Sequence, residues 1–383
     1  MVGLHRAALW GLILLMSMSS RAADTIFSTL GALGAETVVG DSSWRTQRLL
    51  LLCWHGISKE DEHLWRPSLY ITPQLFRRRL EILSELGCTV LSLDDALNRL
   101  WAGDLPPRSV VITFDDGFHD FTDHAVPILK DFGYPSTLYL TTYHVDDQRP
   151  VYNLTVSYLL WKSHGPGRKL PDGTPIGNKV EAELAAQAMV RQALEEGLSA
   201  VEKDKQAREL AAFLGQDYDE LDRRRMLSIM TPDKVQYASQ SGVTIEAHTH
   251  RHRTPDDLDL MTRELRDNIT RIEQITGRRP VHFCYPSGVY NANYFPLLEK
   301  EGFRSATTCE RGLATRTGQR YMIPRWLDTQ NNTESHYRGW LSGLRPLVER
   351  SPGVLTMRDW TNSRATQPAT SAKRRPLQKG YPG

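Results

Sequence analysis

The stretch Thr-Phe-Asp-Asp-Gly at Thr113–Gly117 places two adjacent carboxylates, Asp115 and Asp116, at the end of a strand. Before it, Ser109–Ile112 is a short apolar run rich in β-branched residues, which is typical of a buried strand. Gly117 allows the chain to turn there without steric cost. A bound cation would satisfy two such acids and leave one of them free to handle protons. A solvated acidic turn is the alternative interpretation of this stretch alone.

On both sides of this stretch, short apolar runs alternate with helical patterns. The predicted strands lie near residues 49–53, 88–93, 109–112, 136–141, 243–247, 281–285 and 323–327. Helical patterns with capping residues separate most of them, as at Thr72-Pro73. Strands that are apolar on both faces need helices on both sides of the sheet. The alternation therefore predicts an α/β architecture with parallel strands.

One segment interrupts this alternation. Residues 146–225 contain a Gly/Pro-rich loop and then, at Val180–Leu214, a run rich in Ala, Glu, Lys, Gln and Leu. We interpret the segment as a helical insertion within a single domain of residues 48–345. Residues 24–47 are predicted to be a lead-in linker. Residues 346–383 form a polar, basic and Pro-containing tail that is expected to be disordered.

The N-terminus has the pattern of a secretory signal. His5 and Arg6 precede an apolar run at Ala7–Met18, and small or polar residues follow as far as Ala23. The run is shorter than a membrane-spanning helix requires. We therefore predict a signal peptide at residues 1–23, export to the periplasm or the cell exterior, and no transmembrane span after cleavage. An uncleaved anchor and a misassigned start codon remain alternatives.

Composition excludes some classes of partner and leaves others open. The 383 residues include 47 basic and 45 acidic side chains, so a net charge of +2 offers no electrostatic case for a nucleic-acid partner. The four cysteines are widely spaced, and none belongs to a Cys-x-x-Cys pair. A chain of this size does not need a disulfide framework, although one disulfide after export stays open.

Polar groups follow several of the predicted strands. They are His55, the Asp115–Asp116 pair, the run His248–His252, and Pro286-Ser287-Gly288. In a barrel of parallel strands, these ends all point to one face, and that face carries the active site. Shared position at strand ends therefore predicts that these residues lie together.

Two imidazoles and one carboxylate make a three-ligand metal site that keeps positions open for water and substrate. His248 and His252 are four residues apart, so they face the same way if the chain turns helically after Ala247. If the strand continued, His250 would join them. A polar loop without metal is the alternative, and the absence of a Glu after His248 excludes the zincin pattern.

These paired motifs resemble those of the polysaccharide deacetylases, the NodB-homology proteins of carbohydrate esterase family 4. The resemblance covers about residues 48–344. Besides Thr-Phe-Asp-Asp-Gly and His-Thr-x-x-His, Trp54-His55 is similar to the Tyr-His that opens such domains. The sequence at Phe283–Gly288 is similar to the Tyr-Pro-x-Gly form of their third motif.

The resemblance implies a distorted (β/α) barrel, often with seven strands, and a divalent metal, usually zinc. Asp116, His248 and His252 would hold the metal, and Asp115 would be the general base. The metal would polarise the acetamide carbonyl and acidify its water, and Asp115 would take the proton. A backbone N–H at Ser287 would help to bind the oxyanion, with Tyr285 as a second candidate at the substrate.

Two positions depart from the family pattern. Cys284 stands where many members have an Arg, and Arg325 at the last strand could supply that charge to Asp115, with a surface Arg as the alternative. The Leu-x-His motif, whose His protonates the leaving amine, is not found. His336 is interpreted as structural. His55 is the candidate for the general acid or for a substrate contact.

The sequence thus predicts a metal-dependent hydrolase of carbon–nitrogen bonds that deacetylates N-acetylated sugars in a polysaccharide or oligosaccharide. A barrel of this type that binds carbohydrate with little or no turnover is the alternative, motivated by the missing acid. A metal-assisted hydrolase of another amide or ester is a third possibility. The polysaccharide, the exact metal, the role of the insertion and the oligomeric state stay open.

Overall fold

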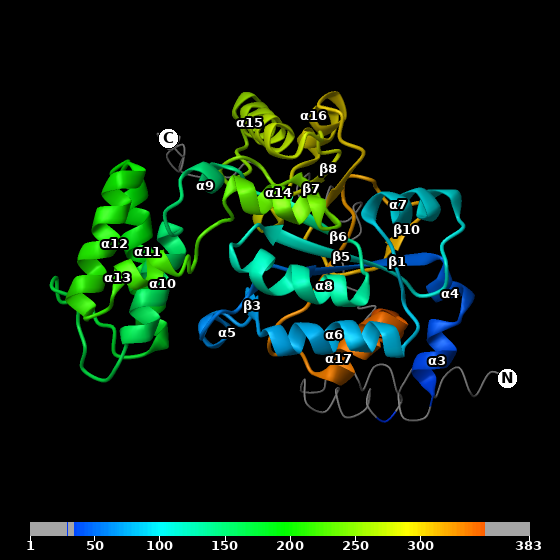
Figure 1. The fold of residues 1–383 in the computed structure, drawn as a ribbon, viewed down its shortest axis with the longest axis horizontal. Helices are drawn as coiled ribbons and strands as arrows, with labels where there is room; N and C mark the ends of the chain where they lie inside the picture. Colours follow the sequence, from blue (N-terminus) through cyan, green and yellow to red (C-terminus); the bar gives the residue numbers. More distant parts are fainter. Residues whose placement is uncertain (1–28, 30–33, 349–383) are drawn as a thin grey trace, which may run out of the picture.

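The computed structural model describes Thr29 and residues 34–348 of the chain (Figure 1). The predicted signal peptide (1–23) and most of the predicted disordered tail (346–383) lie outside these residues, so both stay predictions. The described part of the predicted linker contains two short helices, α3 (Ala35–Gly40) and α4 (Ser43–Thr46). No helix among the described residues combines the length and hydropathy needed to cross a bilayer.

A twisted sheet of nine strands forms the core of the fold, and seven of its strands are neighbours in the order β10-β1-β5-β6-β7-β8-β9. All pairings along it are parallel except that of β10 with β1, and β4 and β11 pair with β5 and β1. The strands are β1 (Arg48–Trp54), β4 (Thr89–Val90), β5 (Ser109–Asp116), β6 (Ser136–Leu140), β7 (Val243–Ala247), β8 (His282–Cys284), β9 (Ser305–Thr307), β10 (Ala314–Thr315) and β11 (Trp326–Leu327). A separate pair, β2 (Gly56–Ile57) and β3 (Tyr70–Ile71), lies beside it.

The sheet curls round until its two ends approach each other. Thr307 of β9 bridges to Ile323, and the segment that follows Ile323 enters β11, which pairs with β1. Seven parallel strands therefore form the wall of the barrel, namely β1, β5, β6, β7, β8, β9 and β11. This confirms the predicted α/β class and distorted barrel.

The two faces of the strands belong to different apolar clusters. On β1, Leu49 and Leu51 pack inside the barrel with Val111 and Tyr139, and Leu93 at the start of α7 (Leu93–Ala102), the helix after β4, joins them. Their neighbours in sequence belong instead to the cluster between the sheet and the outer helices. Alternation of side chains along a strand produces this division, and it confirms that strands apolar on both faces are covered on both sides.

Helices cover the outside of the barrel (Figure 1). They include α5 (Glu62–Trp65), α6 (Pro73–Glu85), α7 (Leu93–Ala102), α8 (Val126–Phe132), α14 (Pro232–Gln240), α15 (Leu258–Thr276), α16 (Phe295–Lys300), α17 (Glu334–Ser342) and α18 (Leu344–Val348). Short π- and 3-10 turns lie at Phe121–Ala125, Pro286–Gly288 and Ala292–Tyr294. Thr72 caps α6 through its side chain, as its Thr-Pro start predicts.

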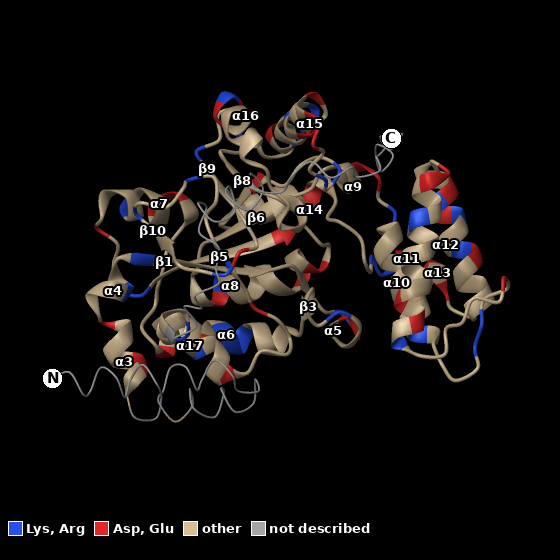
Figure 2. Cartoon of the chain, turned by 180° about the vertical axis from the view of Figure 1, so that it is seen from behind, with Lys and Arg blue, Asp and Glu red and all other residues tan. Residues whose placement is uncertain are grey.

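The segment between β6 and β7 is mostly helical. It contains α9 (Tyr143–Asp146), α10 (Tyr152–Ser163), α11 (Lys179–Glu195), α12 (Ala200–Leu214) and α13 (Tyr218–Arg223). Helices α10 to α12 enclose an apolar cluster of their own. Figure 2 shows acidic and basic residues interspersed along these helices, which is typical of a solvated surface.

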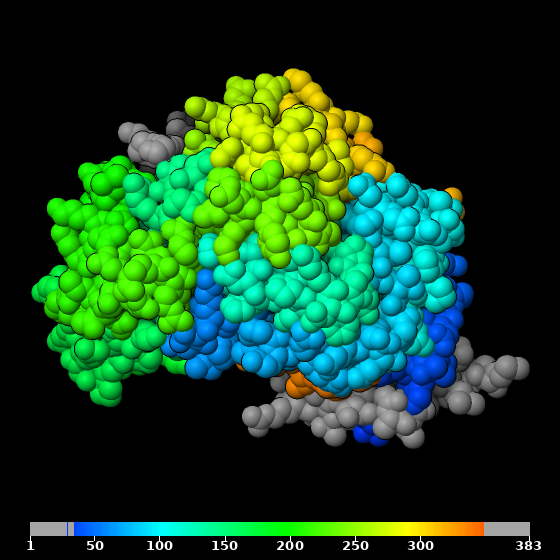
Figure 3. Space-filling view, in the orientation of Figure 1, coloured from blue at the N-terminus to red at the C-terminus, as the bar shows by residue number. Residues whose placement is uncertain are grey.

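The helical segment lies against the barrel on the side of α5 and β3 (Figure 3). Polar contacts join the two parts: the Tyr158 hydroxyl donates to Asp61 at 2.5 Å, and Trp65 donates to Ser157 at 3.3 Å. In Figure 1 the β6 arrow points toward the helical segment. The segment therefore lies beyond the carboxyl ends of the strands, the side at which barrels of this kind carry their sites.

Strand register brings the site residues to one level. Asp116 pairs with Leu140, Leu140 pairs with Ala247, and Ala247 pairs with Phe283. The residues after Ala247 and Phe283 are therefore neighbours of the acidic pair. Gly117 directly follows the last residue of β5. Its φ is 90°, and a Cβ at this position would overlap the Leu140 side chain. Only glycine satisfies both restrictions.

Candidate active site

The two adjacent acids of β5 point in different directions. Asp115 continues the inward row of Val111 and Thr113, and its side chain is 3% exposed. Asp116 has φ at 70°, which turns its carboxylate away from the regular strand direction toward the loop after β7. The pair therefore divides into one acid inside the barrel and one acid at its mouth.

Arg325 forms a bidentate pair with Asp115 inside the barrel. Its Nη1 donates to Oδ1 at 2.6 Å and its Nη2 to Oδ2 at 2.7 Å, and both side chains are almost fully buried. Burial alone would raise the pKa of Asp115, but the charge and hydrogen bonds of Arg325 outweigh it and hold the pKa at about 2. The structure thus brings together the predicted base and the Arg suggested for it.

Two thiols complete the surroundings of Asp115. Cys53 Sγ lies 3.7 Å and Cys284 Sγ 3.6 Å from Oδ2, and Arg325 Nη2 also donates to Cys284 at 3.0 Å. Burial raises the pKa of both thiols, so they are neutral donors. Cys284, which replaces the Arg expected in the third motif, therefore contacts the Arg that supplies the charge from another strand. All four cysteines of the chain are free.

Asp116, His248 and His252 form the second half of the site. Asp116 Oδ1 lies 3.3 Å from His248 Nε2 and 3.2 Å from His252 Nε2, and the three candidate ligand atoms lie within 4.8 Å of one another. Burial opposes ionisation, yet the imidazoles, His252 foremost, hold the pKa of Asp116 well below its usual range. Burial lowers the pKa of His252, but Asp116 raises it by more.

This cluster fits a divalent cation. His248 Nδ1 lies 2.9 Å from the Cys284 carbonyl, which can only accept, so Nδ1 donates there and Nε2, on the other side of the ring, faces Asp116. Asp116 Oδ1 is buried without a hydrogen-bond partner. A buried carboxylate oxygen without a hydrogen-bond partner needs a positive charge beside it. One carboxylate and two imidazoles are a common donor set for such an ion.

Two other groups within the described residues could offer ligand atoms, namely Cys53–His55–Asp115 and Asp115–His248–Cys284. Both include Asp115, whose two oxygens already accept from the Arg325 guanidinium. A second cation would be repelled by that charge at close range. The Asp116 cluster is therefore the better candidate for a metal.

His55 follows β1 and lies at the same mouth of the barrel. Its Nε2 is 3.8 Å from Asp115 Oδ2, its side chain is 17% exposed, and its Nδ1 is buried without a partner. Burial lowers the pKa of His55 below its ordinary value, which favours the neutral imidazole. His55 is thus close to the acidic pair and is able to donate or accept a hydrogen bond.

The two residues predicted at the third motif differ in position. Ser287 is exposed in the turn after β8, with φ at 55°. The Tyr285 side chain is fully buried, and its hydroxyl donates to the Tyr321 carbonyl at 3.1 Å. The structure therefore puts Ser287 on the surface beside the strand ends but does not bring the Tyr285 side chain to the site, because its ring packs among other aromatic rings of the core.

Backbone strain is concentrated at this site. Seven non-glycine residues of the described chain have positive φ, and four of them are Asp116, Thr249, His252 and Ser287. Such conformations cost about 1–3 kcal/mol each and persist where surrounding contacts impose them. The loop after β7 turns tightly as a result, and His250 points away, with Nδ1 2.8 Å from Thr142 Oγ1.

Some residues around the site escaped the sequence interpretation. They are the Cys53 thiol and two buried polar side chains of α15, Glu264 and Asn268. For Cys284, the sequence indicates a departure from the family motif but not its contact with Asp115. The signal for the two α15 side chains is their spacing, because both fall within the apolar row of α15 with Met261 and Leu265. A charged or amide side chain on such a row needs buried partners.

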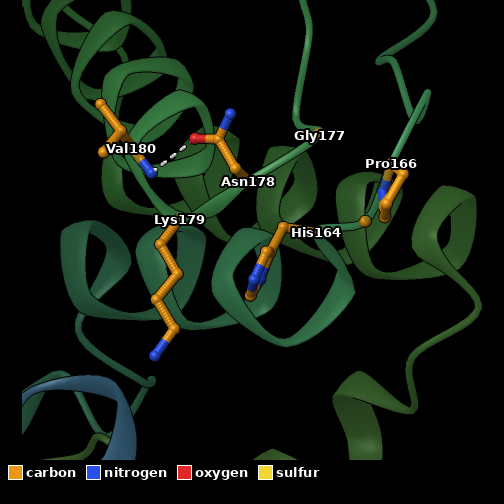
Figure 4. Close-up of a pocket in the computed structure, with 7 residues that line it drawn as sticks. His164, Pro166, Gly177, Asn178, Lys179 and Val180 are labelled. Atoms are coloured by element: carbon orange, nitrogen blue, oxygen red, sulfur yellow. Dashed lines mark hydrogen bonds between the residues drawn. The ribbon is translucent and has the colours of Figure 1, made fainter.

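A cavity of about 590 Å³ lies elsewhere, between the end of α10 and the start of α11 (Figure 4). His164, Asn178 and Lys179 line it, and Asn178 accepts a hydrogen bond from the Val180 amide there. All of its lining residues belong to the helical segment, so it is not part of the candidate active site.

Comparison with known proteins identifies the family. The family model described as polysaccharide deacetylase matches residues 102–306, more than half of the chain. YxkH of Bacillus subtilis (strain 168), named provisionally as a polysaccharide deacetylase, is 21% identical over 311 residues, which are 79% of this chain and 81% of that protein. The poly-beta-1,6-N-acetyl-D-glucosamine N-deacetylase of Escherichia coli (strain K12) is 28% identical over 102 residues, 26% of this chain and only 15% of its own.

Two solved structures share the fold. The Streptococcus pyogenes deacetylase PplD, solved with acetate, has a TM-score of 0.50 at 18% identity, covering 76% of this chain and 96% of PplD. IcaB from Ammonifex degensii has a TM-score of 0.50 at 17% identity, covering 77% and 97%. With the barrel, the acidic pair and the matched family model together, this chain belongs to the polysaccharide deacetylase family, hydrolases that act on carbon–nitrogen bonds.

Proposed function

We propose that the protein is a metal-dependent deacetylase that removes acetyl groups from N-acetylated sugars of a polysaccharide. The observation that carries this proposal is the convergence of Asp116, His248 and His252 at the barrel mouth, one residue away from the acid that Arg325 holds ionised. A relative over 102 residues is named for poly-N-acetylglucosamine, which makes that polymer the first substrate to try.

Asp116, His248 and His252 would hold the metal, with zinc as the first candidate. When bound, a divalent metal would polarise the acetamide carbonyl and make water more acidic, which is the chemistry that a base as weak as Asp115 needs. The donor set of one carboxylate and two imidazoles suits zinc and several other divalent ions.

The residues of the chain have separate roles in hydrolysis. Asp115, kept ionised by Arg325, accepts a proton from the attacking water as its oxygen bonds to the carbonyl carbon. The backbone N–H of Ser287 is a donor for the oxyanion. His55 contacts the sugar or relays to the leaving nitrogen the proton that Asp115 has accepted, as the C–N bond breaks, and acetate and an amine are released.

The N-terminal sequence suggests where the protein works. The apolar run before Ala23 has the pattern of an export signal. We therefore propose an exported enzyme whose partner is a polysaccharide or oligosaccharide.

Acetate release tests the activity. The zinc-loaded protein should release acetate from N-acetylglucosamine oligomers, and Asp115→Asn should abolish release while zinc stays bound. Asp131→Asn is the matched control, because that carboxylate is exposed and pairs with Arg77 far from the site. A protein that binds zinc at the Asp116 cluster and yet releases no acetate from any acetylated glycan would contradict the proposal.

One observation favours a second candidate, a carbohydrate-binding barrel with little turnover. Both oxygens of Asp115 already accept from Arg325, and the carboxylate is almost fully buried. These contacts weaken it as a proton acceptor. Zinc-dependent binding of N-acetylglucosamine oligomers without acetate release would support this candidate instead.

A further inference from the structure

We propose that Glu264 and Asn268 of α15 are positioning residues, which hold the loop of residues 248–253 in the shape that brings His248 and His252 to Asp116. This inference rests on the proposed metal ligands, and neither α15 residue touches the metal or the substrate. Both side chains are buried, at 1% and 0% exposure, on the face of α15 that packs against the barrel.

Glu264 binds the far end of the loop. Its Oε2 accepts from the Arg251 amide at 2.8 Å, and its Oε1 accepts from Arg253 Nε at 2.6 Å and from Arg251 Nη1 at 3.3 Å. Its backbone carbonyl accepts from the His250 amide at 3.2 Å. These bonds end on His250, Arg251 and Arg253, so Glu264 fixes the turn that leads into and out of His252.

Asn268, one helical turn further on, binds the near end. Its Oδ1 accepts from the His248 amide at 3.0 Å, and its Nδ2 donates to the Leu140 carbonyl at 3.0 Å and to Thr142 Oγ1 at 2.9 Å. Thr142 Oγ1 in turn contacts His250 Nδ1. The amide therefore ties the first ligand to the end of β6, the strand beside the one that carries Asp116.

The loop needs such support because its backbone is strained. Thr249 has φ at 59° and His252 has φ at 52°, a region that β-branched and bulky residues avoid. Within the loop, Thr249 Oγ1 accepts from the Arg253 amide at 3.0 Å. Strain of this kind persists only where neighbouring contacts impose it, and Glu264 and Asn268 supply contacts at both ends.

A purely structural role for these side chains would be to attach α15 to the barrel. The chain offers a control for that role. Glu301 accepts from Arg266 of α15 at 3.1 and 2.8 Å and is mostly buried, yet the bond lies away from the loop. Glu301→Gln therefore weakens the attachment of α15 without touching the metal ligands.

The test compares zinc affinity with apo-protein stability. Zinc dissociation constants are measured by competition with a chelating dye, and thermal midpoints are measured with the metal removed. The variants are Glu264→Gln, Asn268→Leu, Glu301→Gln and Asp116→Asn. Loss of groups that orient metal ligands typically weakens metal binding about 10- to 100-fold, so we expect that loss for Glu264→Gln and Asn268→Leu and a change of less than about twofold for Glu301→Gln.

The outcomes separate this inference from the proposed function. Unchanged zinc affinity in Asp116→Asn would overturn the ligand set and the inference with it. Weakened affinity in Asp116→Asn, together with wild-type affinity in both α15 variants, would overturn the inference and leave the ligand set standing. If Glu264→Gln does not fold, Arg253→Gln is tested in its place. It removes the bond from Arg253 Nε to Glu264 from the loop side, and it is expected to weaken zinc binding.

Discussion

Replacing Arg325 with Met should destabilise the protein strongly and in a pH-dependent manner. Arg325 and Asp115 are a buried bidentate pair, and the pKa of Asp115 falls from its ordinary 3.8 to about 2. A difference of about two pKa units corresponds to about 2–3 kcal/mol of stabilisation of the ionised acid. Removal of one partner also leaves a buried charge uncompensated, which typically costs about 3–5 kcal/mol.

The sign of the pH dependence follows from the two folded-state pKa values. In the wild type, the depressed pKa gives stability that is present above 3.8 and is lost as pH falls through about 2. In Arg325→Met, burial without the guanidinium raises the pKa of Asp115, so the variant loses stability as pH rises through that value. The difference in unfolding free energy should therefore be larger at pH 7 than at pH 4.

Urea unfolding of metal-free protein at pH 7 and pH 4 measures this difference. The double variant Arg325→Met/Asp115→Asn completes a mutant cycle, and it should recover part of the lost stability at pH 7 because no charge is left buried. A loss below about 1 kcal/mol at pH 7, or an equal loss at both pH values, would refute the reasoning.

Three further results are expected. Gly117→Ala should lower the free energy of unfolding in urea by about 1–3 kcal/mol, because φ is 90° and the new Cβ would meet Leu140. Gly133→Ala is the control and should lower it by less, because φ is 65° and the space around this residue is open. Equal losses in the two variants would count against the steric argument. Arg45→Met should lower the free energy of unfolding by more than about 3 kcal/mol in the same assay, because it leaves the buried carbonyls of Leu341, Arg48 and Ser109 without their donor. A loss under about 1 kcal/mol would contradict this expectation. Zinc at 100 times its dissociation constant should stabilise the wild type by about 2.7 kcal/mol and Asp116→Asn by much less, and equal stabilisation would speak against the ligand set.

The sequence predicts much of this arrangement because strand ends can be recognised from pattern alone. The apolar run before Asp115 and the one before His248 both end at the barrel mouth, as parallel strands require. Of the two histidines proposed to join His248, the structure brings His252 and not His250 to Asp116. The chain does so through bends with positive φ at Thr249 and His252, and not through the helical turn that the spacing suggests.

Other features could not be predicted because they depend on contacts between distant segments. The bond between Arg325 and Asp115 spans 210 residues, and residue type alone left a surface Arg as an equal alternative. Tyr285 lies in a motif at the site, but core packing turns its ring away. Glu264 and Asn268 are hidden within a helix whose apolar spacing suggests only packing.

The position of a bound metal tests the central claim most directly. Zinc added to crystals of the protein, located by its anomalous scattering, should lie at about 2 Å from Asp116, His248 Nε2 and His252 Nε2. Asp115 should then remain paired with Arg325 and outside the coordination shell. Zinc found instead among Asp115, His248 and Cys284, or bound with no contact to Asp116, would contradict the account.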